Sequence, residues 1–131
     1  MEREYQNNAV RQSVKSSFSE LVREAAEQID MREFTLSRPG LADQARELCA
    51  IIAEVYAMRP EAEIYIAGER LYAGLVSDVF RTLTFEHAEH VLDNYNRATY
   101  VIRNKRVYLR TSLYNSVFEL AASIANDIAS G

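Results

Sequence analysis

The chain has 131 residues, a length that suits a single folded domain. Hydrophobic residues make up 48% and charged residues 26% of it, a balance that argues against an intrinsically disordered chain. Only four glycines and two prolines are present, and this scarcity of turn-forming residues argues against a β-sandwich or barrel. We therefore expect a mainly α fold: a compact bundle of five to six helices with one small two-stranded β-hairpin.

The sequence also restricts where the protein works. Its longest unbroken apolar run, Leu48 to Ala53, is far too short to cross a membrane, and no signal-peptide pattern opens the chain. We expect a cytoplasmic protein with no membrane contact. Its single cysteine, Cys49, rules out an intramolecular disulfide and a cysteine-cluster metal site. Because Cys49 lies inside the apolar run, we expect it to be buried as a small hydrophobic residue.

The first predicted element is an amphipathic helix. Residues 1–9 are polar and expected to be disordered, and apolar residues then recur at spacings of three and four from Val10 to Ile29. This helix should end near Asp30.

The broadest apolar stripe predicts the central helix of the fold. It is preceded by a connection from Met31 to Pro39, in which Phe34 and Leu36 are expected to pack against the core. The stripe then runs from Leu41 to Val55 with spacings of three and four. The helix should end at Arg59-Pro60, because the residue before a proline avoids the α conformation.

A short hairpin is the one strand signal. Ile64-Tyr65-Ile66 alternates, Ala67-Gly68 can turn, and Glu69 to Leu71 can return. Since an isolated two-stranded ribbon is marginally stable in water, the hairpin must pack on helices. A further helix is expected next, with inward-facing residues Leu75, Val76, Val79, Phe80 and Leu83.

Two polar residues mark the starts of the remaining helices. Thr84 is a favourable N-cap for a helix whose buried face ends at Tyr95, and Asn104 can cap the next one, with Leu109 and Leu113 inward. An apolar stripe then continues to the end of the chain, on the same helix or on a separate final one: Leu120, Ala121, Ile124, Ala125 and Ile128. We expect this stripe to fold back on the body, and the alternative is that it packs against a second copy.

The charges are distributed unevenly. The net charge is −4, yet residues 94–118 hold five basic side chains and no acidic one. Four of the eight tyrosines lie in the same segment, among them Tyr100. This composition suits nucleic acid, because basic groups attract phosphate and aromatic faces stack on bases, and it equally suits an acidic protein surface. A third interpretation is that the basic residues of this segment form a solvated helix face without a ligand, while its tyrosines belong to the core.

The candidate binding surface therefore comprises Arg97, Tyr100, Arg103, Lys105, Arg106 and Arg110. Arg106 and Arg110 are four residues apart and share one helix face, which we expect to be exposed. Arg103 either joins them or forms a structural pair with Asp93 or another carboxylate.

No catalytic motif is present in the sequence. There is no glycine-rich phosphate loop and no Gly-x-Ser-x-Gly elbow. His87 and His90 are three residues apart on one predicted helix face, but two histidines alone make a weak metal site. We predict no metal, no cofactor and no enzymatic activity. A deep cleft lined by polar groups around these two histidines would argue against this prediction.

Two groups of residues carry a resemblance to a known family. The first begins with the hairpin Ile64 to Glu69 and continues through Val76, Phe80, Leu83-Thr84, Glu86-His87 and Val91-Leu92-Asp93. The second and more specific group contains Thr99, Ile102-Arg103-Asn104, Tyr108-Leu109, Thr111 and Leu113-Tyr114-Asn115. In these residues the chain resembles the C-terminal domain of RepA-type replication initiators from plasmids and conjugative elements of Gram-positive bacteria. The family-like core is residues 17–115, and residues 116–131 follow as a C-terminal helix where the family commonly turns at Ala-Pro.

The resemblance implies a role in DNA replication. In those initiators an N-terminal winged helix reads the origin, and a C-terminal module similar to the helical domains of DnaD-type primosome proteins serves host-specific replication. It thus implies a non-enzymatic replication module whose partners are host replication proteins, DNA or both. Without a winged helix, the chain is expected to be either a fragment or a stand-alone relative. The alternative function is a helical self-association module that forms a homodimer.

Overall fold

The protein is mainly helical and carries one two-stranded antiparallel sheet, as predicted. The computed structural model describes residues 17–130, so the expectations for residues 1–9 and for a helix beginning at Val10 lie outside the described residues. In chain order the elements are a helix over residues 17–28, α2 (Met31–Ser37), the 3-10 turn η1 (Pro39–Leu41), α3 (Ala42–Ala57), β1 (Glu63–Ile66), β2 (Glu69–Tyr72), α4 (Ala73–Phe80), α5 (Phe85–Arg97) and α6 (Lys105–Ser130).

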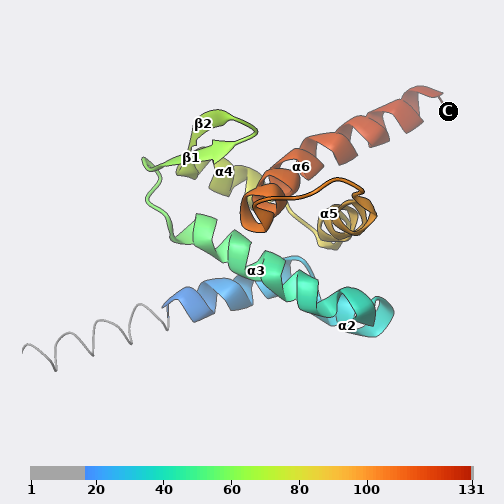
Figure 1. Ribbon diagram of the computed structural model, residues 1–131, viewed down its shortest axis with the longest axis horizontal. Helices are drawn as coiled ribbons and strands as arrows, with labels where there is room; N and C mark the ends of the chain where they lie inside the picture. Colours follow the sequence, from blue (N-terminus) through green and yellow to red (C-terminus); the bar gives the residue numbers. More distant parts are fainter. Residues whose placement is uncertain (1–16, 131) are drawn as a thin grey trace, which may run out of the picture.

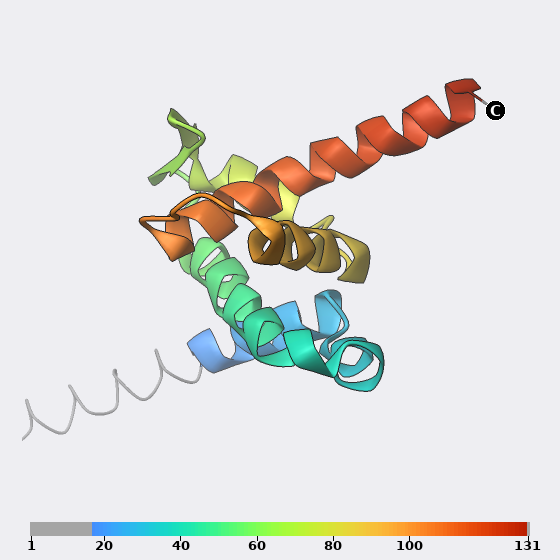
Figure 2. The same cartoon turned by 45° about the vertical axis from the view of Figure 1, so that its right-hand side comes forward.

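Helix α3 is the central element, and Figures 1 and 2 show it running through the middle of the molecule. The helix 17–28 and α2 lie on one side of it, and α4, α5 and α6 lie on the other. Eight of its 16 residues are buried, among them Leu48, Cys49 and Ile52. The helix ends at Ala57 and the backbone is already extended at Met58, so α3 stops two residues before Arg59, the residue that Pro60 disfavours in the α conformation.

The predicted connection after the first helix is wrong over most of its length, because residues Met31–Ser37 form helix α2. Asp30 adopts a left-handed conformation, and its carboxylate accepts a hydrogen bond from the Glu33 amide at 3.3 Å, which caps the new helix. Phe34 is buried as expected, with its ring 4.5 Å from that of Phe85, but Leu36 is exposed. A seven-residue helix that buries one side chain is too short to show periodicity.

The hairpin is confirmed, and its turn explains its sequence. Ala67 and Gly68 both have positive φ angles, 52° and 81°, as the two central residues of a type I′ turn require. Ile64 and Ile66 are buried against the helices. The hairpin is thus attached through its apolar face, as its marginal stability in isolation demands.

Helix α4 follows the hairpin directly and packs closely on the end of α3. Gly74 lies where a Cβ atom would come within 3.1 Å of the Pro60 Cβ, so a larger residue would fit only if Pro60 moved by a few tenths of an ångström. Val76 and Phe80 are buried as predicted, whereas Leu75 is exposed.

Both predicted N-cap positions are confirmed. The Thr84 amide donates to Nδ1 of His87 at 3.0 Å at the start of α5, and the Asn104 Oδ1 accepts from the Val107 amide at 3.1 Å at the start of α6. Burial lowers the pKa of His87, which favours the neutral ring that this capping bond needs.

Helix α6 has two halves in different environments. Leu109, Leu113 and Ser116 are buried, whereas residues 121–129 are all exposed, and both views show the helix extending beyond the body. The expected fold-back of the final stripe is therefore wrong. No glycine or proline interrupts residues 105–130, so the helix continues straight for roughly 39 Å, further than the body reaches.

Candidate interaction surface around the α5–α6 connection

The candidate surface centres on residues 98–104, the connection between α5 and α6. The most exposed apolar residue of this connection is Val101, which is 86% exposed. The neighbouring Tyr100 is also exposed, but its hydroxyl lies 3.0 Å from that of Tyr108, and the two rings meet edge to face. The fold therefore presents Val101 and Tyr100 on a connection tethered to α6.

Two of the predicted basic residues face solvent beside this connection. Arg97 donates to the Asn94 side chain at 2.8 Å, in the last turn of α5, where a positive charge also interacts favourably with the helix dipole. Arg103 is exposed. Among the described residues, neither arginine forms an ion pair with a carboxylate.

The alternative pairing of Arg103 with Asp93 is wrong. Asp93 accepts instead from Arg38 at 2.8 Å, and the same guanidinium reaches Glu89 at 2.8 Å. These hydrogen bonds raise the pKa of Arg38, with the bond to Asp93 as the largest cause. Through these two ion pairs Arg38 connects the end of α2 with α5, and Asp93 is therefore engaged in contacts between helices.

Lys105 and Arg106 are directed to acidic residues of α3. The Lys105 ammonium lies 2.8 Å from Glu47, a bond that raises its pKa, and it also sits over the ring of Tyr95. Arg106 pairs with Glu54. These two contacts connect the start of α6 with α3 and reduce the positive charge that the segment offers to a ligand.

Arg106 is exposed as predicted, but Arg110 is half-buried, which corrects the prediction for that residue. Its guanidinium donates to the carbonyl of Tyr65 in β1 at 3.0 Å, and its Nε is buried with no hydrogen-bond partner among the described residues. Burial, and then the positive charge of Arg106, lowers the pKa of Arg110. The six predicted residues thus divide: Arg97, Tyr100 and Arg103 face outward, and the other three engage the body.

The two histidines do not act together. His87 caps α5, whereas His90 lies 3.0 Å from Glu119 and 3.1 Å from Asn94, at a polar pocket of about 110 Å³. This volume is smaller than the about 300–1,000 Å³ that is usual for pockets that bind organic ligands. The sequence did not predict that Glu119 and other α6 residues line this pocket, because they lie far from His90 along the chain.

Comparison with known proteins identifies the chain at the level of a family. A family model described as a family of unknown function, DUF6017, matches residues 2–131. The chain belongs to the DUF6017 family. No curated protein and no solved structure matches it. The match covers the α5–α6 connection and the exposed end of α6 of this DUF6017 chain, so both features lie inside the family's sequence pattern.

Two further findings concern the described part of the DUF6017 chain. None of its helices combines the length and apolar character needed to cross a membrane. Within residues 17–130 no cluster of three or more histidine, cysteine, aspartate or glutamate side chains is arranged to hold a metal ion.

Sequence reasoning missed Val101 and the acidic partners of the basic segment. An exposed valine has no periodic signal because it lies in a connection. Glu47 and Glu54 are seven residues apart on α3, a spacing that places them on one face of the helix. This spacing was the signal in the sequence that both carboxylates could pair with basic residues of another helix, as they do with Lys105 and Arg106 of α6.

Proposed function

We propose that this chain is a non-enzymatic module of DNA replication initiation on plasmids or other mobile elements. It contacts a host replication protein through the surface formed by Arg97, Tyr100, Val101 and Arg103. The resemblance to RepA-type initiators supports a role in replication, since its most specific residues include Thr99 and Ile102-Arg103-Asn104 of this connection. The observation that carries the proposal is an exposed apolar and aromatic pair beside two arginines that have no carboxylate partner among the described residues.

A protein partner fits this surface better than DNA does. Lys105 and Arg106 are paired with α3 carboxylates and Arg110 is half-buried, so few of the five charges remain to meet phosphates. DNA affinity depends on several phosphate contacts at once. Arginine and tyrosine around an exposed apolar residue are instead typical of protein interfaces, and the arginines favour an acidic partner.

A photo-crosslinking experiment tests this function. A benzophenone amino acid placed at Val101 should crosslink to a replication protein in a host replication extract, and the same group at the exposed Tyr72 of the hairpin should not. Exchanging Arg97 and Arg103 for glutamate should abolish the crosslink. The matched variant Arg59→Glu, which changes an exposed arginine outside the surface, should leave it intact.

DNA binding is measured in parallel by fluorescence anisotropy across a salt series. A DNA affinity whose logarithm falls with log salt by about 0.9 per phosphate contacted, and which the double glutamate variant abolishes, would make DNA the ligand of this surface. If neither a replication protein nor DNA is bound, the proposed function is wrong. Charge reversal at Arg106 or Arg110 is avoided, because those side chains contact α3 and β1 and their change would alter contacts inside the body as well.

A second candidate function is self-association through the end of α6. Phe118, Ile124 and Ile128 are exposed there, and Val117, Ala121, Ile124 and Ile128 alternate at spacings of four, three and four, which is typical of a coiled-coil seam. The partner in this function is the same helix of a second copy.

Light scattering on a size-exclusion column tests the second candidate. The chain should elute with the mass of a dimer, and the variant carrying Ile124→Glu and Ile128→Glu should elute with the mass of a monomer. Ala122→Glu with Ala129→Glu places the same charges on the opposite face of the helix and should preserve the dimer. A monomeric unmodified chain at every concentration would exclude this function.

A further inference from the structure

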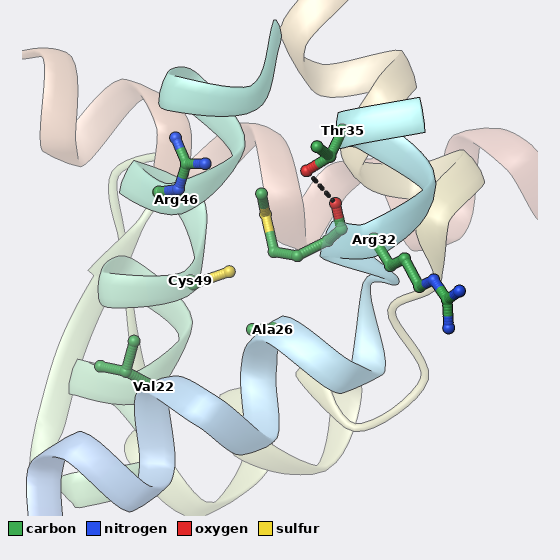
Figure 3. Close-up of a pocket in the computed structure, with 7 residues that line it drawn as sticks. Val22, Ala26, Arg32, Thr35, Arg46 and Cys49 are labelled. Atoms are coloured by element: carbon green, nitrogen blue, oxygen red, sulfur yellow. Dashed lines mark hydrogen bonds between the residues drawn. The ribbon is translucent and has the colours of Figure 1, made fainter. Parts of the chain in front are cut away.

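A pocket of about 400 Å³ opens between the helix 17–28, α2 and α3. Figure 3 shows Cys49 directed into it from α3, with Ala26 and Val22 contributed by the helix 17–28. Met31 of α2 also lines it. This volume falls within the usual range of small-molecule sites, about 300–1,000 Å³, in contrast to the small polar pocket beside His90.

The floor of this pocket is apolar. It consists of an isopropyl group, a methyl group, a thioether and a thiol, from Val22, Ala26, Met31 and Cys49. Burial raises the pKa of the Cys49 thiol to about 11, so at neutral pH the thiol is uncharged. A methionine in such a wall can adjust its conformation to differently shaped apolar ligands.

The rim of the pocket is basic. Arg32 from α2 and Arg46 from α3 stand on its two sides, and no carboxylate lines the pocket. Arg32 is exposed and forms no ion pair with another described residue. Arg46 pairs with Asp43 at 2.6 Å, but both side chains are exposed, so this pair contributes little and can yield to another anion. Long exposed arginines can rotate toward a ligand at the mouth.

We propose that this pocket binds a small amphiphile, with an apolar chain or ring on the floor and a carboxylate at the mouth held by Arg32 and Arg46. The site lies on the side of α3 away from α5 and α6, so it is separate from the surface of the proposed function. A guanidinium matches a carboxylate with two parallel hydrogen bonds, which selects this head group over a neutral or cationic one.

Methionine methyl NMR of the full chain tests the proposal with decanoate as the probe, kept below the concentration at which it forms micelles. The Met31 signal should shift in a saturable way. The Met58 signal should stay in place, because that residue lies at the opposite end of α3. Decanol and decylamine, which have the same chain without the carboxylate, should shift Met31 more weakly.

Three variants complete the experiment. Ala26→Leu fills the pocket from its wall and should weaken decanoate binding at least about tenfold, whereas the matched Ala57→Leu, on an exposed site of α3, should not. Arg32→Ala should weaken it about two- to fivefold, the size expected for one exposed ion pair, and Arg59→Ala should have no effect.

Three results would overturn the proposal. The first is a Met31 signal that decanoate does not move. The second is equal binding of decanoate, decanol and decylamine, because the carboxylate would then have no part in binding. The third is binding that survives Ala26→Leu, because the ligand would then lie outside the pocket.

Discussion

Replacement of Leu113 by alanine is expected to lower the free energy of unfolding by about 2–5 kcal/mol. Leu113 is fully buried in the packed half of α6 and belongs to the main hydrophobic core. The substitution removes its apolar contacts and leaves a cavity that the surrounding helices can close only in part. Urea denaturation followed by circular dichroism at two protein concentrations gives the free energy.

The matched control is Ile128→Ala in the other half of the same helix. Ile128 is 76% exposed, so its truncation should change the free energy of unfolding by less than about 0.5 kcal/mol. A loss as large as that of Leu113→Ala would contradict the exposed position of this end. If that loss grew with protein concentration, the covering surface would be a second copy, as in the self-association candidate.

Replacement of Gln28 by methionine is expected to cost about 2–3 kcal/mol of unfolding free energy. Its side-chain amide donates to the carbonyls of Phe80 and Leu83 at 2.6 and 3.0 Å, and its oxygen accepts from the Tyr56 hydroxyl at 2.7 Å. One side chain thus joins the helix 17–28 to α3 and to the end of α4. Methionine has a similar size but leaves these partly buried polar groups unpaired, and their desolvation is no longer compensated.

Gln44→Met provides the comparison for this substitution. Gln44 also makes two side-chain hydrogen bonds, at 3.0 and 2.9 Å to Asn96, but both residues lie near the surface, where water can replace the lost partner. Its replacement should cost less than about 0.5 kcal/mol in the same urea titration. Equal costs for the two variants would show that Gln28 does not act as a buried junction.

Several parts of the structure depend on local sequence and were predicted correctly. The broad apolar stripe identified α3 as the central helix, and Arg59-Pro60 marked its end to within two residues. Ala67-Gly68 marked the hairpin turn, and Thr84 and Asn104 marked two helix starts. Each signal acts within a few residues, so a single sequence carries it.

Long-range packing decided the rest. Whether a basic side chain is paired depends on carboxylates far along the chain, as Glu47 and Glu54 show for Lys105 and Arg106. The apolar pocket likewise exists because three helices from separate segments enclose it.

The sequence by itself determined the helical class, the central helix, the hairpin and the apolar stripe at the end of α6, because periodicity and capping are local properties. Only the tertiary structure decided that this stripe is exposed and that Arg97 and Arg103, rather than Arg110, face solvent. The physical reason is that burial and charge pairing depend on which distant elements meet.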